Sequence, residues 1–301
     1  MSAANSSLTP AQTAHALVEL GIAKHNTRYE IVFLKAVSAG VMLSFGGLLA
    51  EVFGGGATGL TQSNPGIAKV LTGFVFPAGL VMLVLQGHEL LTSNMMIFPM
   101  AVVKRAIPWW SIPVNWFIVL FGNLVGSLFT AAVLVHFTGI ISTEPYIHYV
   151  QAFAIKKAGD PAWHQIFLRG IGCNWLVCVA IWQGTSSKDT ISKIVALWIP
   201  IWVFVACGFD HIVANMFFIP LGIMFGAELT VAEYVRKSFF ASFFGNIIGA
   251  LLIGLPATYF YLRDYHAGGL RAAEEASTPA KAIETHHDKP STVSLEATSS
   301  N

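Results

Sequence analysis

The chain has 301 residues, of which 54% are hydrophobic and only 11% are charged, with a formal net charge of +1 and a mean hydropathy of +0.63. Soluble proteins carry about 25% charged residues, so this composition excludes an ordinary soluble domain and indicates a protein that uses the bilayer as its solvent. The net charge gives no indication of a nucleic-acid partner. The three cysteines lie in apolar runs without disulfide or metal spacing, and we therefore expect no metal and no cofactor.

The N-terminal segment, residues 1–30, lacks the basic start and apolar core of a cleavable signal peptide. Its stretch from Ala14 to Ala23 is mildly amphipathic, which favours a helix at the membrane surface. Residues 265–301 are rich in Ala, Ser, Thr, Glu and Pro. A segment of that kind cannot bury enough apolar surface to order itself, so we expect a disordered tail.

Between these segments, residues 31–264 form the predicted membrane domain. A helix needs about 20 apolar residues to cross hydrocarbon. Six regions meet this requirement: 32–54, 67–102, 108–138, 165–186, 190–226 and 232–262. The second and fifth are too long for one simple span and carry polar residues in the middle. Lys and Arg in the short loops favour both termini on the cytoplasmic side.

The two halves of this domain resemble each other. The run Gly87–Met95 aligns with Gly208–Met216 in the pattern glycine, any residue, acid, three residues, small residue, Asn, Met. Further along, residues 121–126 align with residues 244–249 in the same order. Each half holds an odd number of spans, so the second half must enter the membrane upside down. The fold class we expect is all-α, with six spans in two inverted repeats and broken second and fifth helices.

The aligned runs place polar residues at mid-depth. The first contains Glu89, Thr92, Ser93 and Asn94, and the second contains Asp210, His211 and Asn215. Ionisable groups in a membrane are by default functional candidates, and irregular chain at this depth must face protein or a water-lined cavity. A helix that resumes after a break presents free amides and a positive dipole, which favour an anion.

Structural roles remain open for most of these residues. His211 could be a hydrogen-bonded core residue, and Glu89 and Asp210 could cap the resumed helices. Buried asparagines need partners in lipid and are expected to hold unwound backbone in place: Asn94, Asn123, Asn174, Asn215 and Asn246. The Gly122–Gly126 and Gly245–Gly249 pairs have the spacing that lets helices approach closely.

The motifs as a group resemble the formate–nitrite transporter family, and within it the fungal nitrite transporters. The resemblance covers roughly residues 10–265. It is carried by the run from Gly208 to Met216, by Leu91-Thr92-Ser93-Asn94, by the run from Cys173 to Trp182 and by the two Gly-Asn-x-x-Gly motifs.

The resemblance implies an aquaporin-like protomer with its own pore, assembled as a homopentamer in the plasma membrane. Thr92 and His211 match the family's pore residues, with Asn174 and Asn215 beside them. Lys157 matches its vestibule lysine, although Lys156 is an alternative. The hydrophobic slits correspond to Phe76, Leu80, Leu91 and Phe204.

The function implied is proton-linked transport of small monovalent anions, most of all nitrite and also formate. One alternative is an aquaporin-like channel for small neutral solutes, but Asn94-Met95 and Asn215-Met216 stand where that class has Asn-Pro-Ala boxes. Another is an intramembrane enzyme using Glu89, Asp210 and His211. No ordered nucleophile–base set supports it.

Overall fold

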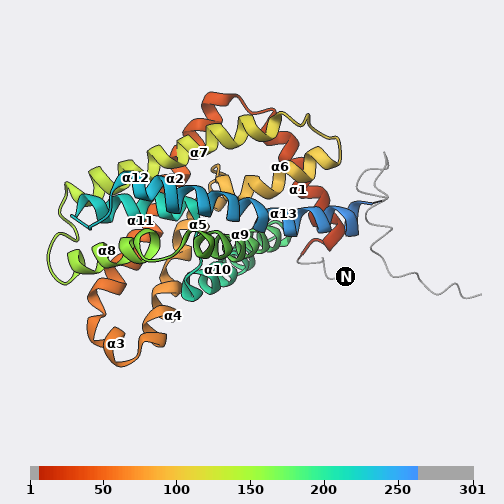
Figure 1. The fold of residues 1–301 in the computed structure, drawn as a ribbon. Coiled ribbons are helices and arrows are strands. Elements are labelled where there is room, and N and C mark those ends of the chain that lie inside the picture. Colours follow the sequence, from red (N-terminus) through yellow and green to blue (C-terminus); the bar gives the residue numbers. More distant parts are fainter. Residues whose placement is uncertain (1–6, 264–301) are drawn as a thin grey trace, which may run out of the picture.

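The computed structural model describes residues 7–263, so the predicted tail at 265–301 lies outside the described part. Within residues 7–263 the chain is helical, and its one β feature is an isolated bridge between Ser7 and Ser187. Figure 1 shows the helices packed into one bundle, from which α3 (Thr58–Ser63) and the adjoining part of α4 (Pro65–Val75) project. The all-α prediction is confirmed.

Among the described residues, six helical segments are long and apolar enough to cross a membrane. They are α2 (Tyr29–Gly56), α4 with α5 (Pro65–Leu85), α7 with η1 (Ser111–His136), α9 (Trp163–Ser186), α10 (Thr190–Cys207) and the run of α12, η3 and α13 (Val231–Leu262). Two shorter apolar helices, α6 (Leu91–Val103) and α11 (Ile212–Met224), complete the predicted second and fifth regions. Six predicted spans and two broken helices are therefore present.

The two glycine pairs lie where helices of the same half cross. A Cβ placed on Gly126 of α7 would lie 2.0 Å from the Val37 carbonyl oxygen of α2. In the other half, a Cβ on Gly249 of α13 would lie 2.3 Å from the Ile171 oxygen of α9. Only glycine permits this approach, so the matched motifs join α2 to α7 and α9 to α13 in the same way.

The N-terminal helix α1 (Pro10–His25) lies beside α6, α9 and α13. Thr9 caps its first turn by accepting a hydrogen bond from the Gln12 amide, and Pro10 begins the helix. Ala14 and Leu17 are fully buried. The apolar face predicted to meet the membrane surface is thus covered by helices of the bundle.

Two further helices occupy the long connection after the third span. They are α8 (Tyr146–Ala154) and η2 (Ile155–Gly159), and both pack against α11. This placement carries Lys156 and Lys157 to the break between α10 and α11.

Candidate functional site at the two helix breaks

Each broken helix is interrupted at a glycine in the left-handed backbone region. Gly87, with φ of 68°, lies between α5 (Pro77–Leu85) and α6, and Gly208, with φ of 82°, lies between α10 and α11. Side chains disfavour this conformation, whereas glycine adopts it without penalty. Both glycines belong to the aligned runs, so in each half a glycine with positive φ ends one helix before the next begins.

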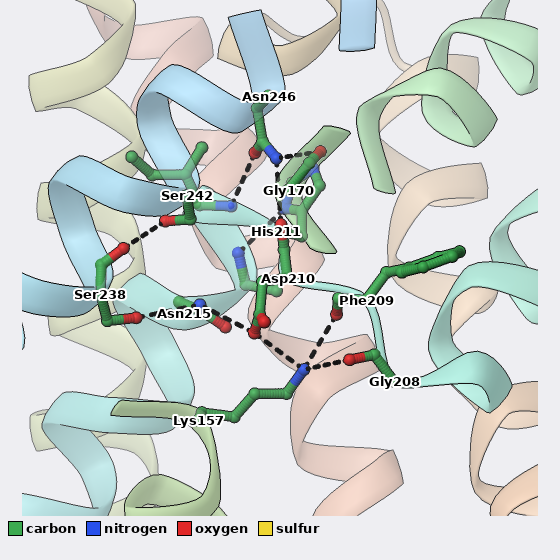
Figure 2. A network of polar contacts seen from close by, with 12 residues as sticks. Lys157, Gly170, Gly208, Phe209, Asp210, His211, Asn215, Ser238, Ser242 and Asn246 are labelled. Carbon is green, nitrogen blue, oxygen red and sulfur yellow. Dashed lines mark hydrogen bonds and ion pairs between the residues drawn. The ribbon is translucent and has the colours of Figure 1, made fainter. Parts of the chain in front are cut away.

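Asn246 holds the second break together from α13 (Figure 2). Its Oδ1 accepts a hydrogen bond from the Ile212 amide at 2.9 Å, and its Nδ2 donates to the carbonyl oxygens of Gly170 at 2.9 Å and Asp210 at 3.0 Å. The side chain is completely buried. The first free amide of α11 is therefore capped by Asn246.

Asn123 performs the same task for the first break. Its Oδ1 accepts from the Leu91 amide at 3.0 Å, and its Nδ2 donates to the carbonyl oxygens of Ala36 at 2.8 Å and Glu89 at 2.9 Å. Because asparagines cap both resumed helices here, the carboxyl groups of Glu89 and Asp210 are available for other partners.

Asp210 is neutralised by Lys157. The Lys157 Nζ lies 3.0 Å from the Asp210 Oδ1 and also donates to the carbonyl oxygens of Gly208 at 3.2 Å and Phe209 at 2.9 Å (Figure 2). Asn215 donates to the same carboxylate at 3.5 Å. Buried charges persist when they are paired and hydrogen-bonded, so this lysine stabilises the break as well as facing the cavity described below.

Glu89 has an equivalent partner that the sequence reasoning missed. The Lys24 Nζ of α1 lies 2.6 Å from the Glu89 Oε2, which also accepts from Asn94 at 2.8 Å. Burial lowers the pKa of Lys24, and the Glu89 carboxylate opposes that effect. The repeat could have revealed the pair. Phe33-Leu34-Lys35 of the first half matches Phe167-Leu168-Arg169 of the second, and Lys24 precedes Phe33 by about as much as Lys157 precedes Phe167.

His211 and Thr92 meet between the two breaks. The His211 Nδ1 accepts a hydrogen bond from the Ala214 amide at 3.0 Å, so the ring hydrogen lies on Nε2. Nε2 lies 2.9 Å from the Thr92 Oγ1 and donates to it. The Thr92 hydroxyl thus accepts from histidine and keeps its own hydrogen available for another acceptor. Both side chains are buried.

The remaining predicted asparagines contact backbone and side chains around this pair. Asn174 donates to the carbonyl oxygens of Thr92 at 3.2 Å and Asn246 at 2.8 Å. Asn94 donates to the Asn115 Oδ1 at 2.9 Å, whereas Asn215 donates to the Ser238 Oγ at 3.3 Å. Asn174 therefore fixes the backbone that carries Thr92.

Two of the four predicted constriction residues are in direct contact. The rings of Phe76 and Phe204 lie edge to face at 5.9 Å, and Phe204 stacks on His211 at the same separation. Leu80 and Leu91 are buried in the same apolar cluster. Phe76 and Phe204 thus place an aromatic region, which disfavours charge, beside the histidine.

A cavity of about 560 Å³ leads to His211 and is lined by Phe76 and Phe204. Its basic lining residues come from three helical segments, α4, η2 and α9: Lys69, Lys156, Lys157 and Arg169. Partial burial, followed by the charges of Lys69, Lys157 and Arg169, lowers the pKa of Lys156. The sequence left Lys156 and Lys157 as alternatives, and both face this cavity. The positive charge around it attracts anions.

The chain is similar in sequence to members of one transporter family. A family model described as formate/nitrite transporter matches residues 11–261. A probable formate transporter of Methanothermobacter thermautotrophicus is 36% identical, over 85% of this chain and 98% of the relative. The formate channel FocA of Escherichia coli K12 is 33% identical, over 86% of this chain and 97% of the relative.

Solved structures show the same similarity. One described as a pentameric formate channel with formate bound has a TM-score of 0.68 and 27% identity, over 79% of this chain and 98% of the other. Another, described as an FNT family ion channel, has a TM-score of 0.74 and 25% identity, over 82% of this chain and 98% of the other.

Proposed function

The chain belongs to the formate/nitrite transporter family, and from this membership we propose that it carries nitrite, and also formate, across a membrane through a pore in each protomer. The family and the structural neighbours are transporters and channels, not enzymes. Relatives named for formate support the substrate class of small monovalent anions. The preference for nitrite rests on the likeness to fungal nitrite transporters.

The observation that carries the proposal is the His211–Thr92 pair at the end of the cavity. The ring donates from Nε2 to Thr92, which leaves the threonine hydroxyl hydrogen for an incoming acceptor. An anion that has lost water in the aromatic region between Phe76 and Phe204 would be met by this donor. Such a donor replaces part of the lost hydration.

Proton linkage follows from the cost of crossing the apolar region. The basic lining of the cavity concentrates the anion, but an isolated charge is expensive in the apolar region. A weak acid crosses more cheaply once its anion carries a proton. Protonating His211 at Nδ1 would break its bond to the Ala214 amide. While the Ala214 amide is bonded to Nδ1, His211 stays neutral, so we assign His211 and Thr92 the role of hydrogen-bonding the substrate and not of giving it a proton.

The assembly and location are also part of the proposal. A structural neighbour is described as pentameric, which supports a homopentamer here. Large apolar side chains such as Phe117 and Phe137 are exposed on the protomer surface, as lipid or subunit contacts require. We place the protein in the plasma membrane with both termini in the cytoplasm.

The test is uptake into liposomes containing the purified protein. Nitrite, formate, nitrate and lactate are compared with and without a pH gradient, beside osmotic assays of water and glycerol permeation. We expect nitrite and formate to enter, faster when the external side is acidic. Permeation by water and glycerol with no anion uptake would instead establish an aquaporin-like channel for neutral solutes.

A further inference from the structure

Glu51 is a buried acid that none of the preceding contacts uses. It lies on α2, it is 1% exposed, and neither of its carboxyl oxygens has a hydrogen-bond partner. It also lines the cavity that leads to His211. In contrast, the acids Glu89 and Asp210 at the helix breaks are both paired with lysines.

The surroundings of Glu51 favour its neutral form. A carboxylate without a partner is among the most costly groups to bury, whereas a neutral carboxyl carries one O–H donor that still needs an acceptor. One helical turn further along α2, the ring of Tyr149 lies against Gly54, where an added Cβ would be 2.2 Å from the Tyr149 hydroxyl oxygen. Tyr149 lines the same cavity, so two hydroxyl-type donors lie near each other in its wall.

Apart from Tyr149 and the free thiol of Cys207, the other titratable groups lining this cavity are cationic or engaged elsewhere. Lys69, Lys156 and Arg169 lie in the lining without a hydrogen bond to Glu51. Lys157 is committed to Asp210, and His211 to Ala214 and Thr92. The cations therefore draw an anion into a space whose wall contains an unused donor.

We propose that Glu51, as a neutral carboxyl, is a hydrogen-bond-donating subsite for a small monovalent anion in this cavity, with the Tyr149 hydroxyl beside it. This proposal rests on the proposed function. Only a hydrogen bond is formed, so Glu51 keeps its proton while the anion occupies the subsite. Ionised Glu51 would lose its donor and repel the anion, so anion occupancy of the cavity falls as the external pH rises.

Two substitutions separate the donor from the charge. Glu51→Gln keeps an N–H donor and cannot ionise, whereas Glu51→Leu removes the donor. For formate uptake from acidic external solution, we expect the KM of Glu51→Leu to be several-fold above that of the wild type. The KM of Glu51→Gln should stay low and rise less with external pH than that of the wild type. Asp160→Asn, which changes an exposed acid outside the cavity lining, is the matched control.

Infrared spectroscopy of the reconstituted protein tests the same subsite without transport. The wild type should show a protonated-carboxyl band that Glu51→Gln lacks, and adding isotopically labelled formate should shift it. Unchanged KM values in Glu51→Leu at every pH, or a band unaffected by formate, would overturn the proposal. Absence of uptake by the wild type would reject the proposed function instead, while the spectrum would still decide whether the Glu51 carboxyl binds formate.

Discussion

His211 and Thr92 are not repeat-related to each other, although they lie at repeat-related breaks. In the alignment of the two halves, Leu90 occupies the position of His211 and Val213 occupies that of Thr92. Each half thus contributes one polar group and one apolar group. The inverted arrangement brings the two polar groups to within 2.9 Å. The His211–Thr92 pair therefore departs from the symmetry of the two halves.

Thr92→Val tests the hydroxyl alone, because valine has nearly the same shape. The change removes the acceptor of the His211 Nε2–H and the donor that we assign to the anion. Loss of one buried hydrogen bond costs about 1–3 kcal/mol, so nitrite uptake should fall by about tenfold or more. Initial uptake per folded protein in liposomes measures this effect. Thr92→Ser keeps a hydroxyl and should retain most activity; equal loss in both variants would assign the effect to packing.

His211→Phe removes both ring nitrogens and preserves the aromatic ring against Phe204. We expect a protein that assembles but transports poorly, since Thr92 loses its partner. The change also removes the side-chain cap of the Ala214 amide, so His211→Asn serves as the control. Asparagine is a good N-cap, yet its amide is too short to replace the imidazole at Thr92. Wild-type uptake by assembled His211→Phe would remove histidine from the pore mechanism.

For the helices, the sequence predicted where the second and fifth spans are broken, but not which side chains stabilise the breaks. Polar residues within over-long apolar regions predicted both interruptions, and the structure has them at Gly87 and Gly208. The caps could not be assigned in this way, because Asn123 and Asn246 come from helices after the breaks. Their spacing along the chain says nothing about which amide each side chain reaches.

The asparagine contacts predict an order of destabilisation. Asn246→Ala removes three hydrogen bonds of 2.9–3.0 Å, whereas Asn215→Ala removes two of 3.3 and 3.5 Å. At about 1–3 kcal/mol for each group left unsatisfied, Asn246→Ala should lower the folded yield and melting temperature more. Asn94→Ala, with bonds of 2.8 and 2.9 Å, should fall between them.

Size-exclusion chromatography after a heating series provides the measurement. If the three variants were destabilised in the reverse order, the hydrogen-bond distances would not reflect how much each asparagine stabilises the fold. Normal yield of Asn215→Ala with lost transport would instead indicate that Asn215, which lines the cavity, contacts the substrate directly.

For the whole molecule, the internal repeat was the most informative part of the sequence. It predicted the inverted arrangement and the position of the breaks, and the family motifs drew attention to His211 and Thr92. Glu51 and Lys24 were missed for a physical reason. Glu51 interrupts an apolar helix outside the aligned runs, and its significance comes from the cavity beside it. Lys24 belongs to the N-terminal segment, and only its packing against the bundle brings it to Glu89.

The aromatic region at Phe76 and Phe204 and the basic cavity together predict which anions are transported. The cations Lys69, Lys156 and Arg169, beside the Lys157–Asp210 ion pair, attract every monovalent anion and cannot discriminate among them. We expect discrimination to arise beside Phe76 and Phe204, whose rings lie edge to face, because an isolated charge is costly in an apolar region. Nitrite and formate can accept a proton and escape much of that cost. Nitrate, the anion of a strong acid, cannot do so.

Uptake of nitrite and formate should therefore accelerate as the external pH falls, whereas nitrate should enter slowly at every pH. Initial rates in liposomes, held at zero membrane potential across about two pH units, measure this difference, since a bare charge gains about 2.3 kcal/mol from each 100 mV. Protein-free liposomes give the rate at which the neutral acids cross lipid alone. Equal, pH-independent rates for nitrate and nitrite would mean that the bare anion crosses the aromatic region. The protonation step would then have no place in the mechanism, and the His211–Thr92 pair would have to compensate for a full negative charge.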